Sequence, residues 1–103
     1  MEIKIGTYHE LGKVADELRR VVFIYEQGIP EEEIFDGLNL QAIHIVVFDG
    51  NAPVATARVL NESDNWRIGL VAVDKSRRGQ HLGEKLCRLP LSTLFLMAVK
   101  KFY

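Results

Sequence analysis

The sequence predicts a single α+β domain, spanning residues 1–103, in which antiparallel strands are followed by a strand, a basic loop and a helix. Three observations lead to this prediction: an amphipathic helical stretch near the N-terminus, two β-rich segments joined by the turn Asp49-Gly50-Asn51, and a glycine-containing loop after Val73. A chain of 103 residues forms one core, because separate cores begin only near about 250 residues.

Composition and charge exclude several classes of protein. Hydrophobic residues make up 48% of the chain and charged residues 26%, which excludes disordered, collagen-like and coiled-coil proteins. Thirteen Lys and Arg oppose fourteen Asp and Glu, so the basic excess needed to bind nucleic acid or an anionic membrane is absent. The single cysteine, Cys87, provides no metal cluster and fits a reducing compartment. We therefore expect a cytoplasmic protein without a metal, a signal peptide or a membrane span.

The N-terminal third predicts a strand and then two helices. Ile3 and Ile5 alternate with charged residues, which indicates a short strand with one buried face. From His9 apolar residues recur at three- and four-residue steps, as on a helix, and this helix should end near Gly28. Pro30, followed by three glutamates, is typical of the first turn of another short helix.

The middle of the chain predicts three further strands. Residues Ile43 to Phe48 and Val54 to Leu60 are rich in β-branched residues and flank the hairpin turn, so they should pair antiparallel. Trp66 to Val73 forms a third β-rich run. Leu82 and Leu86 are four residues apart, which indicates that a helix begins directly after the basic loop.

The loop between Val73 and Leu82 is the most informative segment, because it has the composition of an anion site. The first amides of a helix have no partners within the helix and carry a partial positive charge, and Gly79 allows close backbone approach. Arg78 adds a guanidinium fork suited to phosphate oxygens. Taken alone, the loop fits a phosphate site and a solvated basic turn about equally well.

The surrounding pattern is more specific. Residues Val71 to Gly83 resemble the acetyl-coenzyme A signature of the GNAT N-acetyltransferase superfamily, a loop reading Gln/Arg-x-x-Gly-x-Gly/Ala after a strand of V-x-V type. Arg78 matches its first position and Gly83 its last, while His81 occupies the usual central glycine. Upstream segments also look like the ElaA-like branch of this superfamily: Val22 to Pro30, Ala42 to His44 and Pro53 to Leu60. The resemblance covers roughly residues 1 to 88.

The resemblance implies that acetyl-coenzyme A donates an acetyl group to an amine. The pyrophosphate would lie on the amides from Gly79 to Gly83, and the pantetheine arm would pair with the exposed edge of the strand Leu70 to Val73. A backbone N–H near the end of that strand would stabilise the oxyanion. The expected cofactor-binding residues are Val71, Ala72, Val73, Arg78, Gly79, Gln80, His81, Leu82 and Gly83. We expect His81 to adopt ordinary backbone angles.

Acid–base residues are less well specified. Glu26, at the end of the first helix, is a candidate to attract or deprotonate the amine, although a solvated acid at a helix end is the commoner role. His44 is a candidate base in an aliphatic strand, where a structural histidine is about twice as common. Tyr103 follows Phe102 in a segment that resembles the family's fourth helix, where a tyrosine often protonates the thiolate. Cys87 is expected to be a small core residue.

The chain departs from the family pattern after Arg88, because the family domain continues with further strands and a closing hairpin. We expect an incomplete C-terminus and, because strand edges would be exposed, self-association into a homo-oligomer. Two alternatives remain beside the acetyltransferase: a catalytically incomplete acyl-coenzyme A-binding or oligomerisation module of the same fold, and a generic nucleotide-phosphate binder. The acceptor, a small-molecule or peptide amine, is not specified.

Overall fold

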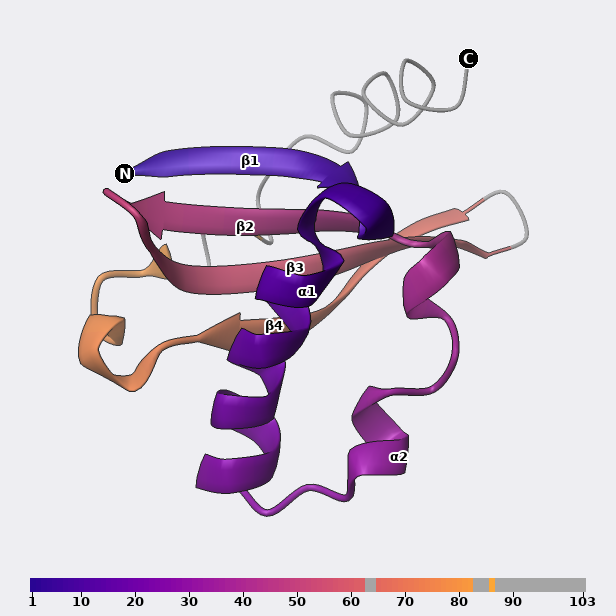
Figure 1. Ribbon diagram of the computed structural model, residues 1–103, viewed down its shortest axis with the longest axis horizontal. Helices are drawn as coiled ribbons and strands as arrows, with labels where there is room; N and C mark the ends of the chain where they lie inside the picture. Colours follow the sequence, from indigo (N-terminus) through magenta and orange to yellow (C-terminus); the bar gives the residue numbers. More distant parts are fainter. Residues whose placement is uncertain (63–64, 83–85, 87–103) are drawn as a thin grey trace.

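The computed structural model describes residues 1–62, 65–82 and 86. Its centre is a sheet of four strands, β1 (Glu2–Thr7), β2 (Ile43–Asp49), β3 (Ala52–Glu62) and β4 (Asn65–Val73). They lie in the order β1-β2-β3-β4 and every neighbouring pair is antiparallel (Figure 1). This arrangement confirms the predicted fold class and each predicted strand. Within the described sheet, β1 and β4 are the outer strands.

One long helical segment crosses a single face of the sheet (Figure 1). It begins as α1 (Tyr8–Arg19). Glu10 caps the N-terminus of α1, because its Oε1 accepts a hydrogen bond from the Thr7 backbone N–H at 3.2 Å. The segment continues without a break as η1 (Arg20–Glu26), which winds as a π-helix, and ends where Gly28 and Ile29 donate to carbonyls of η1. The predicted helix is therefore confirmed, except that its last seven residues are wider than an α-helix.

Short helical turns connect this segment to the sheet. The predicted turn after Pro30 is α2 (Glu31–Ile34), with three acidic residues at its positive end. A 3₁₀ turn, η2 (Asn39–Gln41), leads into β2, and a second, η3 (Lys75–Arg77), follows β4. Among the described helices, none is both long and apolar enough to cross a membrane.

The two faces of the sheet have different chemistry. One face carries an apolar cluster to which Leu82 and Leu86, both helical, contribute buried side chains. The cluster comprises Ile43, Ile45, Val47, Val54, Ala55, Ala57, Val59, Leu82 and Leu86. The face under α1 holds a smaller apolar group, Leu18, Val22 and Ala72, beside buried polar and charged residues. Because strand residues alternate between faces, the same strands provide both environments.

Candidate functional site

The loop after β4 is exposed and ordered by its own hydrogen bonds. The Asp74 carboxylate accepts from the Ser76 N–H at 3.1 Å and from the Ser76 hydroxyl, which fixes the first turn of the loop. The Asp74 N–H donates to the Val54 carbonyl at 2.8 Å, so the loop begins tied to β3. Gly79 follows with φ +89°, and a Cβ built at this position has no heavy atom within 4 Å. The backbone at Gly79 therefore faces open space in a conformation that favours glycine.

Two positions of the loop differ from what the sequence indicates. His81 has φ +60°, so the expectation of ordinary backbone angles is wrong. Histidine is enriched several-fold in this left-handed region among non-glycine residues, which explains how it replaces the family's glycine without changing the turn. Leu82 is helical and buried against the sheet, as predicted. Gly83 lies outside the described residues.

Arg78 does not point freely into solvent. Its Nη1 and Nη2 both donate to the carboxylate of Glu26, with Nη2 to Oε1 at 2.8 Å, and Nη2 also donates to the Val73 carbonyl at 3.2 Å. The hydrogen bond from Arg78 holds the pKa of Glu26 below its ordinary value, and Glu26 raises the pKa of Arg78. The structure thus brings together a residue predicted to bind cofactor and one predicted to act on the amine.

Strand β4 contains a bulge immediately before the loop. Thr56 pairs with Ala72 and Arg58 with Gly69, so the two residues Leu70 and Val71 stand opposite the single residue Ala57. Leu70 takes φ +46°, which is a strained conformation for a bulky side chain. A bulge leaves one residue outside the ladder and bends the strand, and bulges are common beside active sites. The segment predicted to receive the pantetheine arm therefore begins at a break in the sheet.

His44 lies in a different environment, fully buried between β2 and α1. Its Nδ1 lies 3.1 Å from Nη2 of Arg19, and its Nε2 lies 2.8 Å from the Asn39 carbonyl oxygen. A guanidinium can only donate and a carbonyl can only accept, so we assign the neutral tautomer with its proton on Nε2. Burial lowers the pKa of His44, and the neighbouring cations Arg19 and Arg58 lower it further.

The residues around His44 form a connected polar network. Asp16 accepts from the Tyr8 hydroxyl at 2.7 Å, from Arg19 Nη1 at 3.3 Å and from Asn39 Nδ2 at 3.3 Å. Arg58 Nη1 donates to Asp36 Oδ1 at 2.9 Å and to Asn39 Oδ1 at 3.1 Å. With His44 neutral, two aspartates balance two arginines. Below, the term buried network means the buried residues Asp16, Arg19, Asn39, His44 and Arg58, together with half-buried Tyr8 and exposed Asp36 at its edge.

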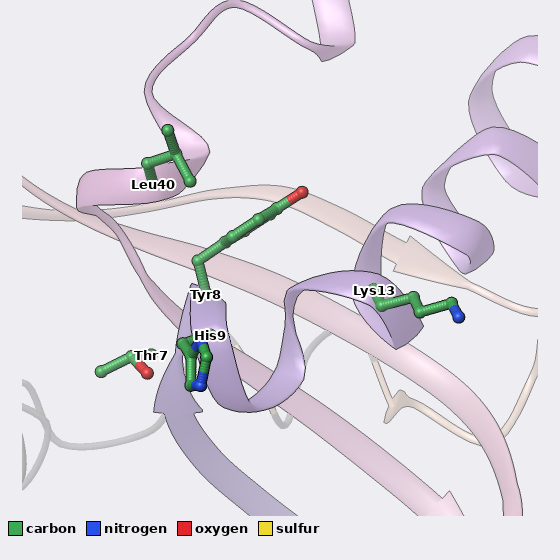
Figure 2. Close-up of a pocket in the computed structure, with 5 residues that line it drawn as sticks. All are labelled: Thr7, Tyr8, His9, Lys13 and Leu40. Carbon is green, nitrogen blue, oxygen red and sulfur yellow. The ribbon is translucent and has the colours of Figure 1, made fainter.

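A hollow of about 490 Å³ beside the start of α1 does not form a second candidate site. It is lined by Thr7, Tyr8, His9, Lys13 and Leu40. Figure 2 shows the Tyr8 hydroxyl and the Lys13 amino group well apart from each other, and the Tyr8 hydroxyl donates to Asp16. The lining groups do not converge, which distinguishes this hollow from the loop after β4. Tyr103 and Cys87 lie outside the described residues.

Comparison with known proteins identifies the family of the chain. The sequence pattern of the acetyltransferase (GNAT) family matches residues 13–101. The chain belongs to this family. Protein ElaA of Escherichia coli (strain K12) is 35% identical over 75% of this chain and 53% of its own length. YjcF of Bacillus subtilis (strain 168), named as an uncharacterized N-acetyltransferase, is 35% identical over 81% of this chain and 59% of its own length.

The crystal structure of Escherichia coli ElaA superimposes with a TM-score of 0.72 at 28% identity, covering 93% of this chain and 68% of that one. The chain is therefore GNAT-like in fold and belongs to the ElaA-like branch. It spans just over half the length of these two curated relatives, 53% and 59%.

Three features of this GNAT chain escape sequence reasoning. The pair of Glu26 with Arg78 joins residues 52 positions apart and leaves no local pattern. The buried network likewise joins residues of α1, η2, β2 and β3 with Asp36 in the loop before η2. The bulge at Leu70 has one usable signal, because Gly69 inside a strand indicates a bulge or a close backbone approach.

Proposed function

We propose that this chain binds acetyl-coenzyme A and transfers its acetyl group to a primary amine. The observation that carries the proposal is the order of features along one short segment: the bulge at Leu70, the open backbone at Gly79 and the helical residue Leu82. Together they offer an extended strand edge for an amide-containing arm and free space above a helix beginning for a diphosphate.

The residues present fit the coenzyme in shape and polarity. The backbone of Val71, Ala72 and Val73 lies in the outer strand of the described sheet, so it is available to pair with an extended ligand. The loop residues Gly79, Gln80 and His81 are exposed, and a side chain added at Gly79 would enter open space. Acetyl-coenzyme A supplies an acetyl group activated as a thioester. We assign the cofactor site to Val71, Ala72, Val73, Arg78, Gly79, Gln80, His81, Leu82 and Gly83.

The bulged strand gives the protein backbone a chemical role in this proposal. An N–H group near Val71 to Val73, next to the bulge that leaves Leu70 and Val71 out of the ladder, would stabilise negative charge on the carbonyl oxygen that the amine attacks. A fixed backbone dipole does this without reorganisation, which is why it is more effective than water. The acceptor is a small-molecule or peptide amine.

Proton transfer remains a proposal for Glu26, His44 and Tyr103. An alkylamine with a pKa near 10 must lose a proton before it attacks, so the chain needs a base. The lowered pKa values of Glu26 and His44 make both of them weaker bases than free carboxylate and imidazole groups. Tyr103 is proposed as the acid for the thiolate. A cytoplasmic location is proposed with the same function.

A second candidate is an acyl-coenzyme A-binding or oligomerisation module without turnover. It is favoured by a hollow of about 360 Å³ lined by Met1, Ile3, Val47, Leu82 and Leu86. All five side chains are apolar, and Met1 and Ile3 are 64% and 47% exposed. The hollow adjoins β1, an outer strand of the described sheet, so a second copy could cover both. Sedimentation that shows only monomer across micromolar concentrations would contradict self-association.

Two measurements test the proposal. Acetyl-coenzyme A at a hundredfold excess over its dissociation constant should stabilise the fold by about 2.7 kcal/mol, seen as a rise in Tm. Thiol release with a panel of amines then separates the candidates, because a binding module would show the rise in Tm but no release above background.

The matched controls are Gly79→Ala and Gly37→Ala. Both glycines have positive φ, +89° and +84°, and open space around them, so the substitutions impose the same backbone strain at different places. Gly79→Ala should lose the stabilisation by acetyl-coenzyme A and Gly37→Ala should keep it. Equal responses from the two variants would contradict the assigned site.

A further inference from the structure

The two adjacent arginines of the loop point to different parts of the molecule. Arg77 forms an ion pair with Asp49 at the β2–β3 hairpin, and Arg78 pairs with Glu26 at the end of η1. Arg78 also donates to Val73, the last residue of β4. Two consecutive side chains therefore attach the loop to two separate elements, one on each side.

The contacts of Arg78 occupy the groups that a phosphate would need. Both Nη atoms donate to the two oxygens of Glu26, which is the side-by-side geometry that guanidinium groups use for carboxylates and phosphates alike. Nη2 carries the additional bond to Val73. The edge between Nη1 and Nη2 is therefore taken by Glu26, and a diphosphate could bind this edge only by displacing the carboxylate.

We propose that Arg78 and Glu26 are positioning residues that act as a clamp, and that Arg78 does not bind the diphosphate directly. This inference rests on the proposed function. The clamp holds the start of the loop against η1 while Arg77 holds it against the hairpin, and the backbone from Gly79 to Leu82 is left to receive the anion. In this arrangement Glu26 serves cofactor binding through Arg78, and this role takes the place of its proposed part in proton transfer.

The alternative assignment makes the opposite prediction. If Arg78 bound phosphate, Glu26 would be an intramolecular competitor, and removing its charge would tighten cofactor binding. In the clamp, removing either charge releases the loop. Exposed ion pairs add little to global stability, so neither variant should unfold the protein. The effect should be confined to the loop and to the cofactor.

The test is a charge swap measured by coenzyme A affinity in titration calorimetry. Glu26→Arg and Arg78→Glu should each weaken binding roughly tenfold, and the double variant should restore it to within about threefold of the starting chain, because the pair is re-formed in reverse. A double variant as weak as Arg78→Glu, together with unchanged or tighter binding by Glu26→Arg, would overturn the clamp.

A matched control removes the effect of net charge. Glu31 pairs with Arg20 at 3.8 Å in another exposed ion pair. Arg78→Glu combined with Glu31→Arg has the same net charge as the swapped pair but cannot re-form the clamp. It should remain about as weak as Arg78→Glu alone, and recovery of binding in this control would contradict the clamp.

Amide hydrogen exchange without coenzyme separates this inference from the proposed function. The clamp predicts faster exchange at the amides of Ser76 and Arg77, which donate hydrogen bonds to Asp74 within the loop, in each single variant and recovery in the swapped pair. That pattern in a chain that does not bind coenzyme A would support the clamp and refute the proposed function. Unchanged exchange in both single variants would refute the clamp, whatever the affinity for coenzyme A.

Discussion

The buried network under α1 and the loop after β4 use the same residue types in opposite ways. Each contains two arginines paired with two carboxylates. In the network, Arg19 is fully buried and Arg58 is 8% exposed, while the side chains of Arg77 and Arg78 are 30% and 42% exposed. Burial makes the first set costly to disturb, whereas the exposed pairs of the second set contribute little to global stability.

The pKa of Arg19 shows how strongly burial acts in the network. Burial lowers the pKa of Arg19 to about 10, although Asp16 opposes the shift. The guanidinium remains charged at neutral pH and depends on Asp16 and the neutral His44 for partners. We propose that the network fixes the position of α1 on the sheet and that the loop carries the binding chemistry.

Asp16→Ala should have the largest effect on stability. It leaves the buried Arg19 without its carboxylate and removes the acceptor of the Tyr8 hydroxyl, so we expect a loss of about 3–5 kcal/mol in the free energy of unfolding. Urea unfolding followed by circular dichroism measures this loss. A shift below 1 kcal/mol would mean that Arg19 can reach solvent without Asp16.

Gly12→Ala should destabilise the same region by a smaller amount. A Cβ at Gly12 would lie 2.3 Å from Cδ2 of Tyr8, so the ring must move from its place over α1. Overpacking of this kind costs about 1–3 kcal/mol, and the better helix propensity of alanine offsets up to about 1 kcal/mol. We expect a net loss of about 1–2 kcal/mol by thermal unfolding. Stabilisation by this substitution would show that the Tyr8 ring does not pack on Gly12.

The pH dependence of stability should report the burial of His44. Its pKa is lowered in the folded state, so unfolding takes up a proton below the ordinary value of 6.5. Stability is therefore complete above pH 6.5 and falls as the pH drops, by at most about 1.4 kcal/mol per pH unit. The groups facing His44 are Tyr8, Asp16, Arg19 and Arg58.

The control for this slope is His44→Gln, whose side-chain oxygen can accept from Arg19 but which does not titrate. It should flatten the curve between pH 6.5 and 5, above the range where the carboxylates with lowered pKa values protonate. Identical slopes for the two proteins would show that His44 is not buried in its neutral form.

Arg77→Gln should have the smallest effect on global stability, and it tests the exposed loop in place of the buried network. Because its pair with Asp49 is partly exposed, we expect a change under about 0.5 kcal/mol in the free energy of unfolding. The affinity for coenzyme A should nevertheless fall, because the loop loses one of its two attachments. Equilibrium unfolding and titration calorimetry on the same sample measure both quantities, and an unchanged affinity would contradict the role of Arg77.

Much of the fold could be predicted from local patterns. The strand alternation, the apolar stripe from His9, the turn at Gly50 and the break at Pro30 are all short-range signals, and each corresponds to an observed element. The π-helical winding of η1 could not be predicted, because it depends on how the helix packs on β4 and meets the turn at Gly28.

The candidate site could be predicted only as a segment. Residues around Gly79 were identified because glycine and arginine before a helix have a local physical meaning. The partners of Arg78, Arg77 and His44 are brought together by the sheet and by α1, at sequence separations that no pattern records. Hence the candidate site is proposed from the sequence, whereas the contacts of its charged residues are known only from the coordinates.

The most direct test of the account is a backbone amide NMR titration with coenzyme A. We predict saturable shifts that are largest at Gly79, Gln80, His81 and Leu82, with further shifts at Val71 to Val73, and little change at Arg19 and His44. Absence of saturable shifts, or shifts centred on the buried network, would contradict the assignment of binding to the loop after β4.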